Sequence, residues 1–174
     1  MAKLKVPVGP ADHAQGPADA PVTLVEYGDY ECPHCGHAHP IVKALQKRFG
    51  SQLRFIFRNF PLREIHPNAE AAAETAEFAG TQGKFWEMHD LIYENQQDLS
   101  DELLSDLTKR LKLDPRELAR ALEIGEFAER VKTDFSGGVR SGVNGTPTFF
   151  INGQRHDADF ELNTLVRAIT EASM

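Results

Sequence analysis

The sequence VTLVEYGDYECPHC occupies positions 22–35 and brings together a strand, a turn and a pair of cysteines. Residues 22–27 are mostly β-branched or aromatic, which predicts a short strand that is buried on both faces. Pro33 fits the first turn of a helix, because the backbone N–H that proline lacks has no partner there. We therefore predict that Cys32 and Cys35 lie at the start of a helix that directly follows a buried strand.

The spacing of these two cysteines indicates redox chemistry. They are the only cysteines in the chain, too few for a disulfide framework or a four-cysteine zinc site. At a helix N-terminus, backbone N–H groups and the helix dipole favour the thiolate of the first cysteine. We predict that Cys32 is the exposed, attacking thiol, and that Cys35 is shielded and resolves the mixed disulfide. A structural disulfide or two inert thiols is the alternative.

Charged residues around the pair are expected to influence Cys32. His34 lies between the cysteines, and in its protonated form it would help to hold the Cys32 thiolate. An exposed histidine with little effect is the alternative. Asp29 and Glu31 place negative charge beside Cys32 and oppose the thiolate. The sequence leaves this balance open.

Glu26 is an unusual residue for a buried strand. It shares a strand face with Val22 and Leu24, so its carboxyl group should enter the core. We predict that its pKa is raised there and that it passes a proton to or from Cys35. A strand twist that carries Glu26 to solvent, or pairing with a lysine or arginine, is the alternative.

The rest of the chain is predicted to alternate strands and helices. The helix that begins at Pro33 should kink at Pro40 and end near Gly50, with these buried residues four positions apart: Ile41, Leu45 and Phe49. Further elements are predicted in this order: a strand at 53–59, helices between 67 and 135, a strand with an Asn152-Gly153 hairpin turn at 148–154, and a helix at 160–172. An α/β core with a helical insertion fits this order.

The Thr146-Pro147 dipeptide follows a turn-rich loop and precedes a predicted strand. A cis peptide bond at this position would leave the carbonyl and the N–H of Thr146 free to pair with an extended peptide, in the manner of an added β-strand.

Taken together, the motifs resemble those of the DsbA-like proteins of the thioredoxin superfamily. The resemblance rests on Glu26, the Cys32-Pro-His-Cys35 motif, Gly145-Thr-Pro147 and the TFFING sequence that follows, and it extends over residues 20–172. It implies an α/β, thioredoxin-like fold in a single domain over 1–174. The thioredoxin core would cover about 20–62 and 140–174, and the helical insertion about 63–139.

The resemblance also implies a function and a site. The function is thiol–disulfide exchange with protein or small thiol substrates, with Cys32 as nucleophile and Cys35 as resolving thiol. The resemblance further implies that Glu26 is the buried acid beneath the pair and that Pro147 is cis and faces the disulfide. Together with Pro33 and His34 these residues complete the predicted catalytic group, and Thr146 with Pro147 forms the predicted substrate-binding group. Thr146 stands where DsbA itself usually has valine, so the direction of electron flow stays open.

Composition limits the partners. The formal net charge of −7 argues against nucleic acid and anionic membranes as partners, and no apolar stretch is long enough for membrane insertion. We expect a monomer that exchanges with thiol- or disulfide-containing proteins and with a redox partner protein or glutathione. No secretory signal is recognised, which predicts a cytoplasmic location for the chain as written, or a periplasmic one if it is a mature form.

Three other functions remain open on the sequence alone. Cys32 and Cys35 with His37 or His39 are residues of a type that binds zinc or copper, although we expect no metal and no cofactor. A glutathione-dependent transferase or isomerase on the same fold is a second alternative. The third is an interaction module that presents Trp86 and neighbouring aromatic residues. The remaining histidines are assigned no function: His13, His66, His89 and His156.

Overall fold

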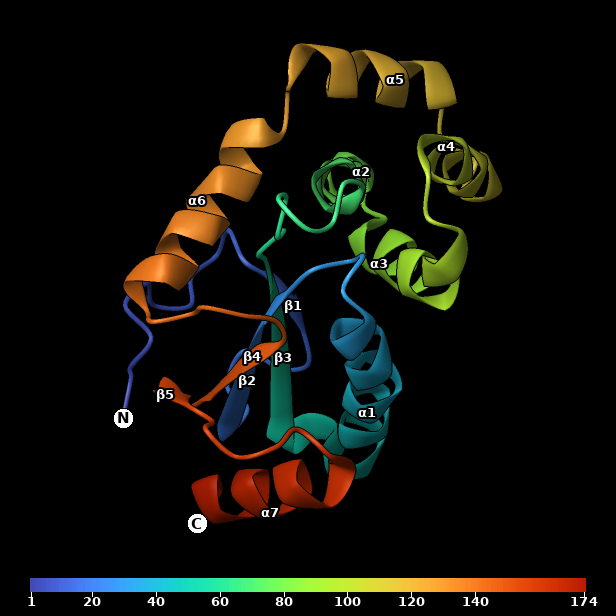
Figure 1. Cartoon of the computed structure of the whole chain (residues 1–174). Helices are drawn as coiled ribbons and strands as arrows, with labels where there is room; N and C mark the ends of the chain where they lie inside the picture. The colour runs from blue at the N-terminus through green and yellow to red at the C-terminus, as the bar shows by residue number, and fades with distance from the viewer.

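The computed structural model describes all 174 residues and contains one five-stranded sheet. The strand order is β1-β3-β2-β4-β5. The central strands β2 and β3 are parallel, and the other pairs are antiparallel (Figure 1). The strands have these bounds: β1 His13–Gln15, β2 Val22–Gly28, β3 Leu53–Asn59, β4 Thr148–Ile151 and β5 Gln154–Arg155.

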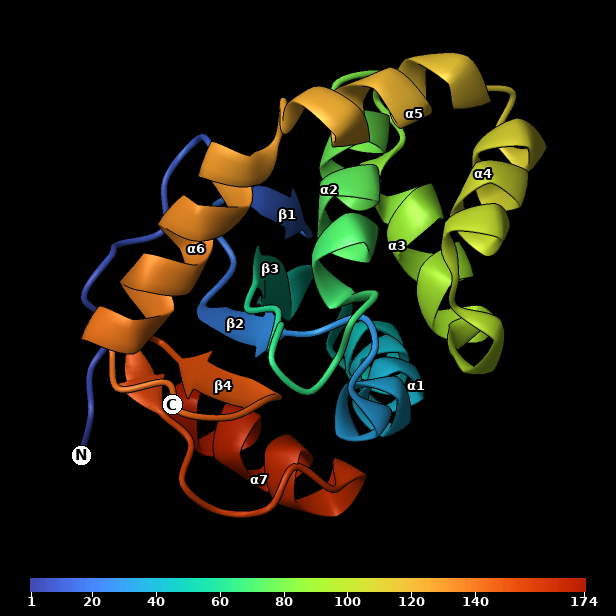
Figure 2. The same ribbon diagram turned by 45° about the horizontal axis from the view of Figure 1, so that its top comes forward.

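The chain has seven α-helices, and five of them lie between β3 and β4 in the sequence. Their bounds are α1 Pro33–Phe49, α2 Ala69–Gly80, α3 Phe85–Glu94, α4 Asp101–Arg110, α5 Pro115–Ile124, α6 Ala128–Arg140 and α7 Leu162–Ala172, with short 3-10 turns η1 Gly50–Gln52 and η2 Gln96–Asp98. Figure 2 shows α2 to α5 grouped together away from β4 and α7. This arrangement confirms the thioredoxin-like α/β fold, whereas the insertion boundaries at 63 and 139 stay a prediction. No helix has the length and apolar character to cross a membrane.

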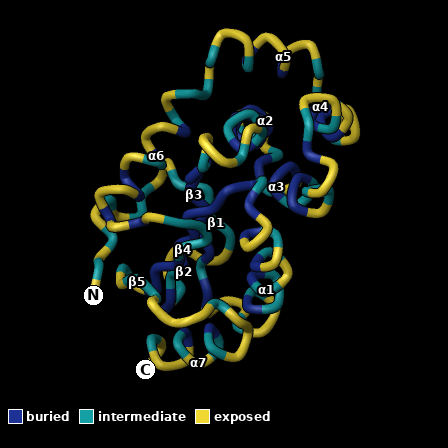
Figure 3. The backbone as a smooth tube through the Cα atoms, in the orientation of Figure 1, coloured by how far each residue is buried: buried dark blue, intermediate teal, exposed yellow.

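Both faces of β2 and β3 are covered, which explains why the two strands are almost entirely buried (Figure 3). One face, with Leu24 and Phe57, packs in the larger core with α1 and α7. The other, with Tyr27 and Ile56, packs against residues near the N-terminus and α6. Arg58 lies on this second face and is only 3% exposed, because it donates to the Asp12 carboxylate and the Tyr27 hydroxyl.

Helix α1 begins as predicted, but its buried stripe is different. Pro33 occupies its first turn, and Gly50, with φ 51°, follows its last residue. The buried residues are Cys35, Ala38, Val42 and Leu45, and only Leu45 belongs to the predicted stripe. Ile41 and Phe49 are partly buried at its flank. The helix is rotated so that Cys35 faces the sheet, and the other buried residues follow it at successive steps of three or four positions. The kink expected at Pro40 stays a prediction.

Two other local sequence features agree with the structure: the residue before α5 and the turn between β4 and β5. Asp114 accepts a hydrogen bond from the Arg116 N–H and caps α5, as its position before Pro115 suggests. Asn152 and Gly153 both have positive φ, 47° and 83°, which is the requirement of the type I′ turn that the sequence predicted between β4 and β5.

Candidate active site

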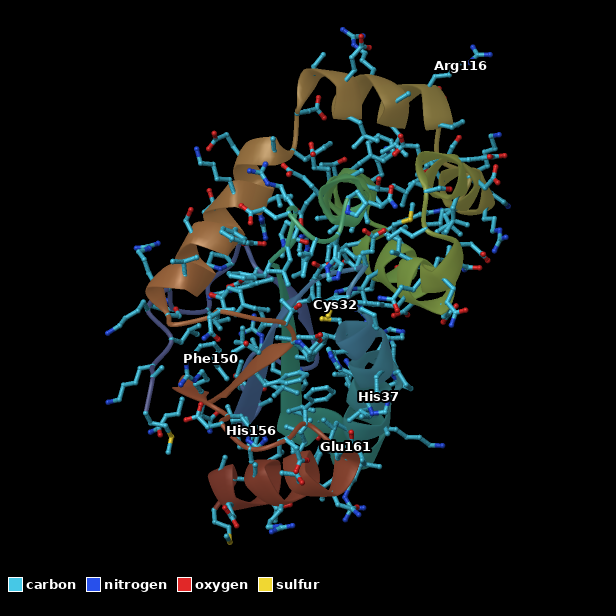
Figure 4. All side chains as sticks on the ribbon, in the orientation of Figure 1. Cys32, His37, Arg116, Phe150, His156 and Glu161 are labelled. Carbon is cyan, nitrogen blue, oxygen red and sulfur yellow. The ribbon has the colours of Figure 1, made fainter.

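The two cysteines lie where β2 ends and α1 begins. Cys32 is the N-cap residue of α1, with φ −69° and ψ 123°, and Pro33 takes the first helical position. Cys35 lies one turn further along the helix, and both cysteines are free thiols. Figure 4 places Cys32 at the top of α1, where the end of the sheet faces the inserted helices.

Cys32 is buried, so the prediction that it is exposed was wrong. Its exposed fraction is 4%, compared with 0% for Cys35. The Thr146 carbonyl lies 3.6 Å from Cys32 Sγ, and the Gln96 amide donates to the carbonyls of Tyr30 and Cys32. Cys32 is covered by segments that are distant in sequence, and its position at the start of a helix gives no information about them. The order of burial, with Cys35 deeper than Cys32, is as expected.

The two thiols differ in ionisation. The pKa of Cys32 is lowered to about 5, most strongly because the Cys35 thiol donates a hydrogen bond to its sulfur. The Thr146 side chain and the backbone N–H groups of Cys35 and His34 lower it further, while burial opposes the change. Burial, the hydrogen bond with Cys32 and the charge of Glu26 raise the pKa of Cys35 well above its ordinary value. At neutral pH, Cys32 is therefore a thiolate and Cys35 a thiol.

Asp29 organises the turn before the cysteines, a role that the sequence analysis missed. Its Oδ1 accepts from the backbone N–H groups of Glu31, at 2.7 Å, and Cys32, at 3.2 Å. Its Oδ2 accepts from the Leu62 N–H and lies 2.8 Å from His66 Nδ1. An aspartate that accepts the N–H two residues ahead is a familiar turn device and was visible in the sequence. The contacts with Leu62 and His66 cross the fold and were not.

The negative charges that the sequence placed beside Cys32 do not prevent its ionisation. The Asp29 carboxylate is fully buried and directed at these donors, and the Asp29 N–H points at Cys35 Sγ, 3.5 Å away. The Glu31 carboxylate turns away and accepts from the backbone and side chain of Asn68. The lowered pKa of Cys32 settles the balance in favour of the thiolate.

Glu26 lies in the core as predicted. It is 2% exposed on β2, between Phe57 of β3 and Phe149 of β4. Its Oε1 has no hydrogen-bond partner, and no basic residue pairs with it. Burial, with a smaller contribution from the Cys32 charge, raises the pKa of Glu26 to about 8. The carboxyl group is therefore mostly protonated at neutral pH, and its role as a proton donor stays a prediction.

The Thr146–Pro147 segment lies against the cysteines. Its peptide bond is cis, and the Thr146 carbonyl accepts a weak hydrogen bond from Cys32 Sγ. Because the Cys32 thiolate has no proton to donate, this carbonyl becomes free when Cys32 ionises. The Thr146 hydroxyl is buried and forms no hydrogen bond of ordinary geometry, but it lies near enough to Cys32 to lower the pKa of that thiol. The expected peptide contact of Thr146 and Pro147 stays a prediction.

The histidines near the pair separate into different environments. His34 is exposed and forms no hydrogen bond through its ring. His37 Nε2 lies 2.9 Å from Glu161 just before α7 (Figure 4). His39 instead faces Asp90 of α3. Neither His37 nor His39 joins the cysteines in a ligand cluster, so the geometry does not assemble the cysteine–histidine metal site that was considered as an alternative.

Comparisons with known proteins agree with this fold. BdbD from Bacillus subtilis superposes with a TM-score of 0.88 at 27% identity, over 99% of this chain and 98% of that one. A thioredoxin-like oxidoreductase from Silicibacter pomeroyi DSS-3 gives a TM-score of 0.80 at 25% identity, over 94% and 93% of the two chains.

A curated relative, named Na(+)/H(+) antiporter NhaA 1, from Salinispora arenicola (strain CNS-205), is 46% identical over 97% of this chain. The match covers 26% of the relative, so the chain spans about a quarter of the length of the curated relatives it matches.

The fold and the cysteine site define a DsbA-like protein of the thioredoxin superfamily, which confirms the resemblance seen in the sequence. The thioredoxin family model matches residues 9–171, and the chain belongs to that family.

The lowered pKa of Cys32 can be tested by titrating thiolate absorbance in the reduced protein. We expect a midpoint near pH 5, with the thiolate present above it. Cys35→Ala removes the hydrogen bond that lowers this pKa most, so the midpoint should rise toward 9, the ordinary value. A wild-type midpoint near 9, or one that Cys35→Ala leaves unchanged, would contradict the arrangement.

The burial of Glu26 predicts a pH-dependent cost in stability. In the unfolded chain Glu26 ionises near pH 4.5, whereas in the folded protein it ionises near pH 8. The unfolded state therefore binds fewer protons between these values, and the free energy of unfolding falls as pH rises through this window. The free energy of unfolding of Glu26→Gln, measured in urea, should therefore exceed that of wild type by an amount that grows by a few kcal/mol between pH 5 and pH 8.

The oxidised protein provides the control for the Glu26 measurement. The Cys32 thiolate contributes to the raised pKa of Glu26, and a disulfide carries no such charge. The stability difference between Glu26→Gln and wild type should therefore be smaller in the oxidised protein. A pH-independent difference between Glu26→Gln and wild type would show that Glu26 is ionised in the folded protein.

Proposed function

We propose that this chain is a thiol–disulfide oxidoreductase that exchanges disulfides with protein or small thiol substrates through Cys32 and Cys35. The proposal rests on one observation: two thiols at the N-terminus of α1 have opposite pKa changes, downward for Cys32 and upward for Cys35. The Cys32 thiolate is a nucleophile and a good leaving group, whereas Cys35 stays protonated as a thiol.

The exchange proceeds through a mixed disulfide. A substrate thiolate attacks Cys32 Sγ in the oxidised pair, a substrate–Cys32 bond forms, and the Cys32–Cys35 bond breaks with its electron pair on Cys35. A second substrate thiolate then attacks the substrate sulfur of the mixed disulfide and releases Cys32 as a thiolate. The substrate loses two electrons and becomes a disulfide, and the cysteine pair is reduced. The same steps in reverse reduce a substrate disulfide.

Glu26 supports the step in which Cys35 leaves. A thiolate at Cys35 is unfavourable because the residue is fully buried and its pKa is raised. Glu26 lies close enough to affect that pKa and carries a proton at neutral pH. It therefore gives this proton to Cys35 during reduction of the pair and takes it back during oxidation.

Thr146 and Pro147 provide the surface on which an extended substrate rests. Ionisation of Cys32 frees the Thr146 carbonyl, and the Thr146 N–H has no partner within the chain. A substrate backbone that pairs with these two groups would hold its own cysteine beside Cys32 Sγ.

The glutathione-dependent alternative receives less support. A transferase needs one activated sulfur or hydroxyl, whereas here the Cys35 thiol is the main reason for the low pKa of Cys32. The two sulfurs are coupled as a pair, which favours exchange over single-nucleophile chemistry.

The low pKa of Cys32 predicts an oxidising pair. Stabilising the thiolate stabilises the reduced form, which raises the reduction potential. In graded glutathione buffers we expect a potential closer to about −120 mV than to about −270 mV. Thr146→Val removes a side chain that lowers the pKa of Cys32, and should make the potential more negative by on the order of 30 mV. A wild-type reduction potential of about −270 mV would identify a reductant instead.

The division of labour between the cysteines predicts different behaviour of two serine variants. Cys35→Ser should accumulate a mixed disulfide through Cys32 with a peptide that carries one activated cysteine, because no resolving thiol remains. Cys32→Ser should form almost none, since Cys35 is buried and protonated. Mass spectrometry of both adducts checks this. Equal trapping by the two variants would refute the assignment of roles.

A further inference from the structure

A second group of potential ligands lies between α1 and α3, outside the cysteine site. His39 comes from α1, and His89 and Asp90 are consecutive residues of α3. Each offers one ligand atom, and these atoms all lie within 4.8 Å of one another. We propose that His39, His89 and Asp90 form a binding site for a divalent metal ion of the zinc class, a set of ligands that the sequence did not suggest.

The spacing is close to that of a metal centre. With bonds of about 2.0–2.1 Å to nitrogen and oxygen, neighbouring ligand atoms of a tetrahedral zinc site lie about 3.4 Å apart. His39 Nε2 and Asp90 Oδ1 are already 3.6 Å apart, too long for a hydrogen bond. The rings of His39 and His89 have centroids 5.5 Å apart. Small rotations of the His39 and Asp90 side chains would bring all three ligand atoms to a common ion.

The His89 ring is also held in place. Its Nδ1 lies 2.9 Å from the Tyr30 hydroxyl, and its Nε2 has no hydrogen-bond partner in the protein. One nitrogen that binds a metal and another that is oriented by a hydrogen bond is the usual arrangement of a ligating histidine. Aromatic rings enclose His89, among them Phe57 and Trp86, so its orientation is rigid.

The Asp90 carboxylate already has a cationic partner, the Lys43 ammonium group. Lys43, one turn after His39 on α1, places its Nζ 2.9 Å from Asp90 Oδ1 and donates to Oδ2 at 3.0 Å. The Lys43 side chain is 39% exposed, so it can swing into solvent when an ion takes the carboxylate. Lys43 thus competes with the metal, and removing it should strengthen binding.

The ion would also connect two parts of the fold. Helix α1 carries Cys32 and Cys35, and α3 belongs to the helices between β3 and β4. An ion held by both helices binds only the folded arrangement, so it should raise the thermal stability of the protein.

The test is a titration of the full chain with zinc chloride. The background is the Cys32→Ser/Cys35→Ser double variant, in which no thiol can bind the ion. Calorimetry should show one equivalent bound, and thermal unfolding should shift upward with zinc. Magnesium chloride at the same concentration should give neither effect, because imidazole ligands favour the zinc class.

Three single variants in that background locate the ion. His39→Ala should weaken zinc binding at least tenfold, while His37→Ala, on the same helix but paired with Glu161, should leave it unchanged. Lys43→Met should tighten it severalfold. Circular dichroism verifies that each variant is folded. Absence of zinc binding, or binding that His39→Ala leaves intact, would overturn the proposal, as would equal losses in His39→Ala and His37→Ala.

Discussion

The arrangement of the cysteine site depends on one buried carboxylate. Asp29 accepts the backbone N–H groups of Glu31 and Cys32 with one oxygen, and with the other it contacts the Leu62 N–H and His66. It thereby joins the turn after β2 to the segment after β3. Each of these contacts satisfies a buried polar group, so the loss of any one partner would leave a costly unpaired group. The position of Cys32 at the start of α1 follows from this contact.

The ionisation states at the site depend on whether hydrogen bonds compensate for burial. Cys35 and Glu26 are shielded without a compensating charge, so both favour their protonated forms. Cys32 is also buried but receives hydrogen bonds from Cys35 and the helix backbone, so it favours the thiolate. Two protons thus remain beneath one negative sulfur. This gradient of ionisation, and not exposure, distinguishes the attacking residue from the resolving one.

Patterns local in sequence were predicted well. The β-branched run at 22–27, Pro33 after a cysteine and the Asn152-Gly153 turn each specify backbone geometry within a few residues. The burial of Cys32 was missed because Thr146 covers it from a segment more than a hundred residues away. The convergence of His39 and His89 was missed for the same reason: these histidines lie on separate helices, and their spacing in sequence has no meaning until α1 and α3 are packed together.

The N-terminal residues have a structural role that affects how this domain can be joined to others. The backbones of Ala2, Lys3 and Leu4 pair with the β5 hairpin, so they protect an edge of the sheet from pairing with other chains. Figure 1 places both chain ends near β5 and α7, away from the start of α1. In a longer polypeptide, a tether at either end would leave from this side. The end of the molecule that carries the cysteine pair would then lie on the side away from the tether.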